Sequence, residues 1–333
     1  MNNKIKIDKG ATKQNYVVQL IEKYIREGIY KKGDILPSVN KLGEELEISR
    51  LTVMSAYRIL KTKGVITSAP GKGYFVSSER TELQHRIFLL FDELNGFKED
   101  LYNSFIAHMG DESFVDIYFH HFNKEHFKRL ILESIGKYTA YVVMPVNFVG
   151  ISDVLNKIPN GRLYILDQIS EEIPNNIPAV YQDFECDIYN GLAQIKERLK
   201  RYEILVLSHY DHYRKPIGIL KGFKKFCEDY GFNYIVENSI KTRKIKKGEV
   251  YILTEDRNLI HILLRAQDAG LVPGKDIGII MYNETDLRKV TGNGITTIST
   301  DFKKMGESLA WMIKKQRRDR ILNPSSIILR SSL

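Results

Sequence analysis

The residues with the clearest chemistry lie in one stretch of the chain, residues 35–76. Arg50 can form two parallel hydrogen bonds with a guanine edge or bind a phosphate, and Thr52 can contact a phosphate or a thymine methyl group. Ser49 can cap a helix, and the N-terminus of a helix can face a phosphate. Lys72 lies between two glycines, where the negative potential of a minor groove would attract it. Together these side chains indicate contact with DNA.

Apolar residues at helical spacing predict the elements that position these side chains. Ser38 is the start signal of a short helix, and Ser49 begins a second helix that Gly64 ends. The inner face of the second helix is apolar and comprises Val53, Ala56, Tyr57 and Leu60. Two β-prone segments, 65–68 and 74–76, follow and predict a hairpin. This order is typical of a winged helix–turn–helix domain.

We predict DNA contacts from the outward-facing positions of these two helices and from the tip of the hairpin. The predicted positions are Ser38, Asn40, Ser49, Arg50, Thr52, Met54, Arg58, Gly71, Lys72 and Gly73. The glycines of the tip would let the hairpin enter the minor groove of double-stranded operator DNA.

This stretch resembles the DNA-binding domain of GntR-family transcriptional regulators. The family pattern, LPS…LA…L.VSR.TV…Y..L...G.I....G.G.FV, is matched within residues 1–78, together with an upstream helix that we expect over 13–29. The resemblance implies a recognition helix that starts at Ser49 and a wing. Asn40 and Met54 depart from the pattern, because the family often has arginine at both positions. The operator sequence therefore cannot be transferred from the family.

Charge and composition agree with a DNA-binding protein. The chain has 333 residues, of which 43% are hydrophobic and 27% charged, as expected for a soluble protein with more than one domain. The formal net charge is +9, and residues 1–80 hold fifteen lysines and arginines against eight acidic residues. The chain has no signal-peptide pattern and no apolar run of membrane-spanning length, so we expect a cytoplasmic protein.

The rest of the chain has a different pattern of apolar residues. After a polar linker at 79–85, short apolar strands alternate with amphipathic helices through residues 86–333. This alternation predicts doubly wound parallel sheets, and the segment is too long for one sheet. We therefore expect an α/β multidomain protein, with a winged helix–turn–helix domain over 1–78 and two α/β subdomains with a cleft over 86–333.

Residues 86–333 resemble the effector-binding domain of LacI-type repressors, which has a type I periplasmic-binding-protein fold. The matching segments occur in the family order and are 91–95, 222–223, 253–256, 269–277, 296–306 and 329–332. The resemblance implies a two-lobed periplasmic-binding-protein-like domain that binds a small sugar or sugar-derived effector. The arginine with which the family binds its effector would fall at Ile219. Two alternatives follow: Arg214 replaces it, or this ligand contact is lost.

In doubly wound sheets, ligands bind at the carboxyl ends of the strands. The side chains that we expect there are Asp92, Asn95, Phe97, Asn147, Asp167, Asp183, Tyr210, Arg214, Asp256, Asn283, Thr300 and Phe302. Carboxylates and amides exchange hydrogen bonds with hydroxyl groups, and aromatic faces pack against C–H surfaces. The set therefore suits a neutral polyol such as a monosaccharide, although each acid alone can equally be a helix cap or a turn residue.

Other residue groups give no catalytic or metal-binding pattern. The histidines that lie near one another are His120, His121 and His126, and His209 with His212. No acid or thiol accompanies them at ligand spacing, so we expect exposed strand-end or loop positions. The two cysteines, Cys186 and Cys227, fit reduced, partly buried thiols. No nucleophile elbow, Walker loop or paired-carboxylate motif is found, and we expect neither an enzyme nor a cofactor.

These observations predict a transcriptional regulator of carbohydrate utilisation, a repressor, whose DNA binding is controlled by a small sugar in the C-terminal cleft. We expect a homodimer, because two recognition helices one DNA turn apart read a pseudo-palindrome. Two alternatives remain for the C-terminal domain: it binds a non-sugar metabolite, or it serves only for dimerisation. An enzyme with a fused winged domain would need a Schiff-base lysine motif, and the sequence has none.

Overall fold

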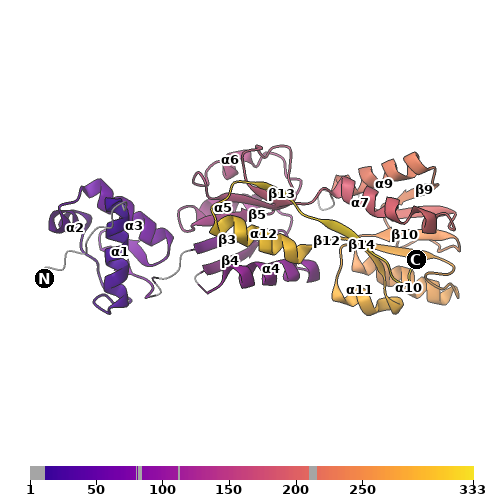
Figure 1. Cartoon of the computed structure of the whole chain (residues 1–333), viewed down its shortest axis with the longest axis horizontal. Helices are drawn as coiled ribbons and strands as arrows, with labels where there is room; N and C mark the ends of the chain where they lie inside the picture. Colours follow the sequence, from indigo (N-terminus) through magenta and orange to yellow (C-terminus); the bar gives the residue numbers. More distant parts are fainter. Residues whose placement is uncertain (1–11, 80, 82–84, 112, 210–215) are drawn as a thin grey trace.

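The computed structural model describes residues 12–79, 81, 85–111, 113–209 and 216–333. Three bodies lie in a row, with a winged domain at one end, a first lobe in the middle and a second lobe at the other end (Figure 1). Most of the predicted linker falls outside the described residues. None of the described helices is long and apolar enough to cross a membrane.

The winged domain has three helices followed by a two-stranded hairpin. Its elements are α1 (Lys13–Arg26), α2 (Val39–Leu46), α3 (Arg50–Thr62), β1 (Ile66–Ala69) and β2 (Gly73–Val76). Ser38 and Ser49 cap α2 and α3, as the sequence predicts, and Gly64 follows α3 with a φ of +73°. The predicted inner face of α3 is buried over its whole length and packs on α1, which ends earlier than expected.

The first lobe is a six-stranded parallel sheet with the order β13-β7-β6-β5-β3-β4. Its N-terminal elements are β3 (His85–Phe91), α4 (Gly96–Met109), β4 (Ser113–Phe119), α5 (Lys124–Ser134), β5 (Ala140–Val143), α6 (Ser152–Leu155), β6 (Leu163–Asp167) and β7 (Ala179–Tyr181). Helix α12 (Phe302–Lys314) and strand β13 (Arg320–Leu322) join it from the C-terminal part of the chain. In β3, Ile87, Leu89 and Phe91 face the core under α4 and α12, whereas Phe88 and Leu90 face the opposite core. Burial on both faces explains why β3 is apolar from Ile87 to Phe91.

The second lobe repeats this architecture with the strand order β14-β12-β11-β10-β8-β9. Its elements are α7 (Phe184–Gln194), α8 (Lys196–Leu199), β8 (Ile204–Ser208), α9 (Ile217–Tyr230), β9 (Tyr234–Glu237), β10 (Glu249–Leu253), α10 (Asp256–Asp268), β11 (Gly278–Tyr282), α11 (Asp286–Val290), a 3-10 turn (Thr291–Asn293), β12 (Thr296–Thr300) and β14 (Ser325–Ile328). Only β14 runs antiparallel to its neighbour in this sheet of described strands. The winged domain and the two parallel-sheet lobes confirm the predicted fold class.

The described chain passes between the lobes three times, after β7, after β12 and after β13. Asn323 lies at the last crossing and is buried, and its side-chain amide donates to Thr300 Oγ1 at 2.7 Å and to the Asp301 carbonyl at 2.8 Å. Two of the three crossings are therefore tied to each other by one amide.

The sequence missed or misplaced several short elements. The helix expected over 149–157 is only α6, because Gly150 has a φ of +72° and the helix can start only after it. The helix expected over 187–200 starts at Phe184 and divides at Ile195, whose φ of −112° is not helical. Strand β13 and helix α11 were not predicted, because three or five residues carry too little periodicity.

A glycine lets two helices pack closely in each lobe. A Cβ atom on Gly222 of α9 would lie 2.1 Å from the Glu185 carbonyl oxygen of α7. A Cβ atom on Gly306 of α12 would lie 2.4 Å from the Leu101 carbonyl oxygen of α4. Backbone occupies both positions, so a side chain there can be accommodated only if the helices separate.

We predict that Gly222→Ala and Gly306→Ala each lower the free energy of unfolding by about 1–3 kcal/mol, the typical cost of overpacking. Urea unfolding followed by circular dichroism measures the loss. Asn103→Ala, at an exposed position of α4, is the control and should change stability by less than about 0.5 kcal/mol. Wild-type stability in both glycine variants would show that the helix pairs are not closely packed.

Candidate functional site

The predicted DNA-contacting side chains of α2 and α3 are exposed or half-buried. Asn40, Arg50 and Arg58 are exposed, and Met54 is half-buried. The Ser49 hydroxyl accepts the Thr52 backbone N–H at 3.2 Å and lies 2.8 Å from the Thr52 hydroxyl. The Thr52 hydroxyl is therefore engaged within the cap, which leaves its methyl group for contact with a base.

A buried tyrosine fixes the recognition helix against the rest of the winged domain. Tyr57 of α3 is 0% exposed, and its hydroxyl donates to the Pro37 carbonyl at 2.8 Å, just before α2. Its ring meets the Tyr74 ring of β2 edge-on at 4.7 Å. Burial raises the pKa of Tyr57 far above the ordinary tyrosine range, so the hydroxyl keeps its proton and remains a donor. One side chain thus sets the position of α3 relative to both α2 and the wing.

The wing has the geometry that its glycines allow. Gly71 and Gly73 have φ angles of +72° and +101°, and Lys72 between them is exposed. The Lys72 backbone N–H donates to the Ala69 carbonyl at 3.1 Å and closes the turn. The Lys72 ammonium group is thus presented at the tip of a short hairpin.

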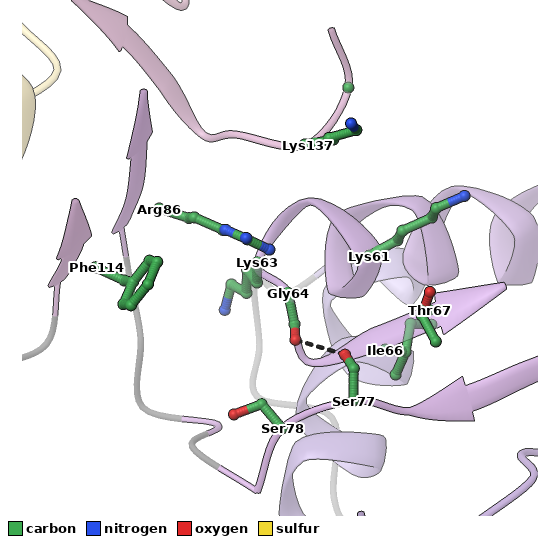
Figure 2. A pocket seen from close by; sticks show the side chains of 11 residues that line it. Lys61, Lys63, Gly64, Ile66, Thr67, Ser77, Ser78, Arg86, Phe114 and Lys137 are labelled. Carbon is green, nitrogen blue, oxygen red and sulfur yellow. Dashed lines mark hydrogen bonds between the residues drawn. The ribbon is translucent and has the colours of Figure 1, made fainter. Parts of the chain in front are cut away.

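The winged domain and the first lobe enclose a cavity of about 490 Å³ (Figure 2). The basic residues that line it are Lys61, Lys63, Arg86 and Lys137. The Thr62 hydroxyl donates to the Gly136 carbonyl across the junction at 3.2 Å. Gly64 lies so close to the Arg86 guanidinium that a Cβ atom there would be 2.7 Å from Nη1. Sequence reasoning missed this junction, because nothing in the local pattern indicates which lobe residues face α3.

The carboxyl ends of the first-lobe strands bring three of the predicted effector residues close together. Asp92 follows β3 and forms a buried ion pair with Lys98 of α4. Asp167 ends β6 with a φ of +72°, and its carboxylate accepts a hydrogen bond from Gln182. Asn95 caps α4 by accepting the Lys98 backbone N–H at 3.2 Å. Asn95 therefore has a structural role in addition to any contact with a ligand.

Two carboxylates of the cleft have raised pKa values. Burial raises the pKa of Asp167, with Asp92 adding to the effect and Lys98 opposing it. Burial together with the nearby Asp183 raises the pKa of Asp187 to about 7. Asp187 was not among the predicted residues. Its position one helical turn after Asp183, which caps α7, was the available signal.

Both lobes contribute buried polar atoms that have no hydrogen-bond partner among the described residues. These atoms are Gln182 Oε1, Asp187 Oδ2, Tyr282 OH, Asn283 Oδ1 and Thr285 Oγ1. Tyr282 is 3% exposed, and its pKa is raised by burial and by Asp187, Asp167 and Asp183. The two lobes touch nearby, where a Cβ atom on Gly96 would lie 3.5 Å from Thr285 Cγ2. Because buried polar groups in native proteins are normally hydrogen-bonded, this cluster indicates a place for a ligand or water.

A cavity of about 610 Å³ opens beside this cluster, between the first-lobe strand ends and the start of α9. The predicted residues Asn147 and Asp183 line it together with Gln182, Phe184 and Lys221. Asn147 accepts a hydrogen bond from Gln168, another lining residue. A small molecule with several hydroxyl groups fits a space of this size.

Other predicted effector residues have partners within the protein. Asp256 pairs with the buried Arg288 at 2.7 Å. Thr300 accepts from Asn323 at the crossing between the lobes. Phe302 is 5% exposed, lies in the first-lobe core and stacks on Phe97 at 4.7 Å.

Tyr210 and Arg214 lie outside the described residues. For the described effector candidates, contact with a ligand stays a prediction.

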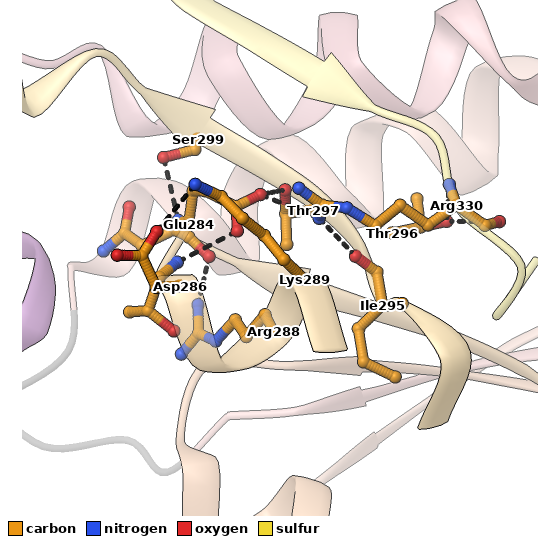
Figure 3. A network of polar contacts seen from close by, with 12 residues as sticks. Glu284, Asp286, Arg288, Lys289, Ile295, Thr296, Thr297, Ser299 and Arg330 are labelled. Atoms are coloured by element: carbon orange, nitrogen blue, oxygen red, sulfur yellow. Dashed lines mark hydrogen bonds and ion pairs between the residues drawn. The ribbon is translucent and has the colours of Figure 1, made fainter. Parts of the chain in front are cut away.

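A polar network holds the start of α11 beside the cleft (Figure 3). The Glu284 carboxylate accepts from the Thr297 hydroxyl at 2.6 Å and from Arg330 at 2.8 Å. The Glu284 backbone N–H donates to the Ser299 hydroxyl at 2.9 Å. Arg330 belongs to the C-terminal segment that resembles the LacI-type ending, and it also donates to the Ile295 carbonyl at 2.6 Å. The network ties the ends of β11 and β12 to the C-terminal segment.

The histidine expectation was wrong for two residues. His120 and His209 are buried, and His120 Nε2 lies 3.0 Å from the Met144 carbonyl. Burial lowers the pKa of His120 to about 4, so its imidazole is neutral near pH 7. The described residues contain no group of histidine, cysteine and acidic side chains suited to a metal ion. Of the cysteines, Cys227 is buried and Cys186 is exposed, and both are free thiols.

Comparison with known proteins agrees with this geometry in the N-terminal domain. Residues 13–76 match the family model "Bacterial regulatory proteins, gntR family". The uncharacterized HTH-type transcriptional regulator YjiR of Escherichia coli (strain K12) is 37% identical over 71 residues, which are 21% of this chain and 15% of that protein. The alignment therefore spans a small part of this relative. The winged domain is of the GntR type.

Two solved structures resemble the two-lobed part. The dimeric Lac repressor with an 11-residue C-terminal deletion has a TM-score of 0.61 and 15% identity over 74% of this chain and 98% of that chain. A LacI family transcriptional regulator from Arthrobacter sp. FB24, in complex with lactose, has a TM-score of 0.62 and 13% identity over 75% of this chain and 99% of that chain. At these identities the likeness shows the fold, which is the LacI-type, periplasmic-binding-protein-like fold. The matched family and both neighbours are transcription regulators and not enzymes.

The raised pKa of Asp187 leads to a prediction about stability. In the folded protein this pKa is about 7, above its ordinary value of 3.8, so the folded state binds the proton more tightly than the unfolded chain does. The folded state therefore loses stability relative to the unfolded chain as the pH rises from about 4 to about 7. Asp187→Asn removes this loss. We expect the variant to gain stability relative to wild type between pH 5 and pH 8.

Urea unfolding at pH 5 and at pH 8 measures the free energy of unfolding of the variant and of wild type. Asp268→Asn, at an exposed position of α10, is the control and should follow wild type at both pH values. Equal pH dependence in Asp187→Asn and wild type would contradict the raised pKa.

Proposed function

We propose that this protein is a DNA-binding transcriptional regulator whose affinity for operator DNA is set by a small effector bound between its two lobes. The observation that carries the effector proposal is the cluster of buried polar atoms, supplied by both lobes, that lack partners among the described residues. The GntR-type winged domain, with exposed Arg50, Arg58 and Lys72, supports the DNA-binding part. We place the protein in the cytoplasm, where operator DNA and sugar-derived metabolites meet.

The proposed effector is a sugar or sugar derivative that lowers DNA affinity, so the protein is a repressor of carbohydrate utilisation. The carboxylates and amides at the cleft and the cavity beside it are suited to hydroxyl groups. The lactose complex of the fold neighbour from Arthrobacter sp. FB24 supports a sugar in a cleft of this kind. A non-sugar metabolite is the second candidate.

Strand β3 offers a physical route from the effector to the DNA-binding domain. Asp92 follows the end of β3 at the cleft, and Arg86 near its start contacts Gly64 at the end of the recognition helix. Seven strand residues span about 20 Å, and β3 is buried on both faces, so it moves as a rigid unit. An effector that draws Asp92 and the second lobe together would shift Arg86 and the winged domain with it.

We propose that the regulator is a homodimer in which α10 and α11 meet their copies. Ile260 and Leu264 on α10 and Leu287 and Val290 on α11 are each more than half exposed. These helices adjoin, because Arg288 of α11 pairs with Asp256 of α10. Neighbouring exposed apolar side chains of this kind mark an interaction site. A second copy is the occupant that also supplies the second recognition helix for a palindromic operator.

We predict that Arg50→Ala weakens binding to the promoter DNA upstream of the protein's own gene by about 10- to 100-fold. This is the loss expected for one bidentate base contact of about 1–3 kcal/mol. Fluorescence anisotropy at fixed salt concentration measures the affinity. Lys224→Ala removes the same charge from an exposed position of α9 and is the matched control. Unchanged DNA affinity in Arg50→Ala would exclude α3 as the recognition helix.

We predict that Leu264→Lys shifts the protein from dimer to monomer, because each copy would have to bury an unpaired lysine in the proposed interface. Sedimentation velocity measures the mass. Tyr230→Lys, which introduces the same charge on α9 at the opposite face of the second sheet, should leave the dimer intact. A dimeric Leu264→Lys protein, or a monomeric wild type, would contradict the proposed interface.

A further inference from the structure

The described part of the cleft between the lobes holds more negative than positive charge. Asp167, Asp183 and Asp187 lie around Tyr282, because all three raise its pKa, and Asp92 lies near Asp167 because it raises the pKa of that residue. Among the described residues, Lys98 is the cation of this group, and it is paired with Asp92. Three carboxylates are left without a matching cation of their own.

The unpaired atoms of the cluster are mostly acceptors. Gln182 is 5% exposed, and its amide nitrogen donates to Asp167, which leaves Gln182 Oε1 buried without a donor. Asp187 Oδ2 and Asn283 Oδ1 are likewise acceptors without a partner among the described residues. Tyr282 and Thr285 add two hydroxyl groups, each of which can donate one hydrogen bond and also accept. The described part of the site therefore has more acceptors than donors and more negative than positive charge.

The other described charges near the cleft are already engaged or lie at its edge. Arg288 donates to Asp256 and to the Tyr282 carbonyl, and Arg330 is paired with Glu284. Lys221 is exposed at the rim of the cavity, which also contains exposed or half-buried acids. Ile219, which stands where the LacI-type effector arginine would fall, is 2% exposed in the second-lobe core. The described part of the cleft thus offers no free cation to neutralise Asp167 or Asp187.

We propose that the effector carries a protonated amine, as in an amino sugar or another polyhydroxylated amine. An ammonium group has three donors and no acceptor, which complements the acceptor-rich cluster, and its charge compensates the half-buried carboxylates of Asp167 and Asp187. A neutral sugar supplies donors but no charge, and an acidic sugar adds to the repulsion. This inference rests on the proposed function, because it assigns a chemical class to the same effector site.

The test uses full-length protein and sugars that share one skeleton but differ in charge. The probes are glucosamine, glucose, N-acetylglucosamine and glucuronate, with the galactose and mannose equivalents. Thermal shift identifies binders, and isothermal titration calorimetry at pH 7 measures their affinities. We expect at least one amine to bind tenfold or more tightly than its neutral and N-acetylated counterparts, and the acid not to bind.

Two variants assign the preference to the cluster. Asp187→Asn and Asp167→Asn should each reduce the affinity for the amine by tenfold or more and lower the ratio of amine affinity to neutral-sugar affinity, because a neutral sugar loses only a hydrogen bond and no charge compensation. Asp268→Asn makes the same change at an exposed position of α10 and should bind as wild type does. Two independent variants keep the test valid if one of them fails to fold.

The outcomes separate this inference from the proposed function. Equal or tighter binding of a neutral sugar overturns the amine inference and leaves a sugar-responsive regulator in place. An amine preference that survives both aspartate variants, or binding of no amine in the panel, also overturns it. The proposed function is judged separately, by the binding of promoter DNA to wild-type protein and to Arg50→Ala.

Discussion

Burying a carboxylate is costly unless a cation or several donors compensate it, and this cost governs the cleft between the two lobes. Asp92 is compensated by Lys98, whereas Asp167 receives one amide donor and Asp187 keeps an oxygen without a partner among the described residues. The raised pKa values of Asp167 and Asp187 are two expressions of the same cost. A ligand that supplies donors and charge would relieve it. The free energy gained would favour the arrangement of the lobes in which both sides reach the ligand.

The architecture converts such a local gain into movement of whole bodies. The described chain passes between the lobes three times, and Asn323 ties two of the crossings together, so the lobes can move only as hinged units. In the first lobe, β3 runs from the cleft to the junction with the winged domain. At that junction Arg86 and Gly136 of the lobe contact the end of α3. Within the winged domain, Tyr57 couples α3 to α2 and to the wing. A shift at the junction therefore moves these three elements, which carry the predicted DNA contacts, together.

Local sequence signals predicted the helices and strands well where a residue type can have only one structural role at its position. Ser38 and Ser49 cap helices, the glycines of the wing have positive φ angles, and residues 87–91 of β3 are apolar because both faces of the strand are covered there. The same signals were ambiguous at the cleft. Asn95 and Asp183 were predicted as effector residues and are also helix caps, since one side-chain oxygen serves either purpose. His120 looked like a loop residue, but its strand end is covered by neighbouring aromatic rings.

The sequence by itself determined the winged helix–turn–helix, the alternation of strands and helices, and the division into a basic reading domain and a larger α/β domain. Each follows from the spacing of apolar residues, caps and glycines over a few turns or strands. Only the tertiary structure decided that Asp167, Gln182, Asp187 and Tyr282 meet, and that Arg86 lies against Gly64. These residues are far apart in the chain or lie on different lobes, and sheet order and the crossings bring them together. Their burial, and hence the energetic cost of their charges, depends on what surrounds them in space.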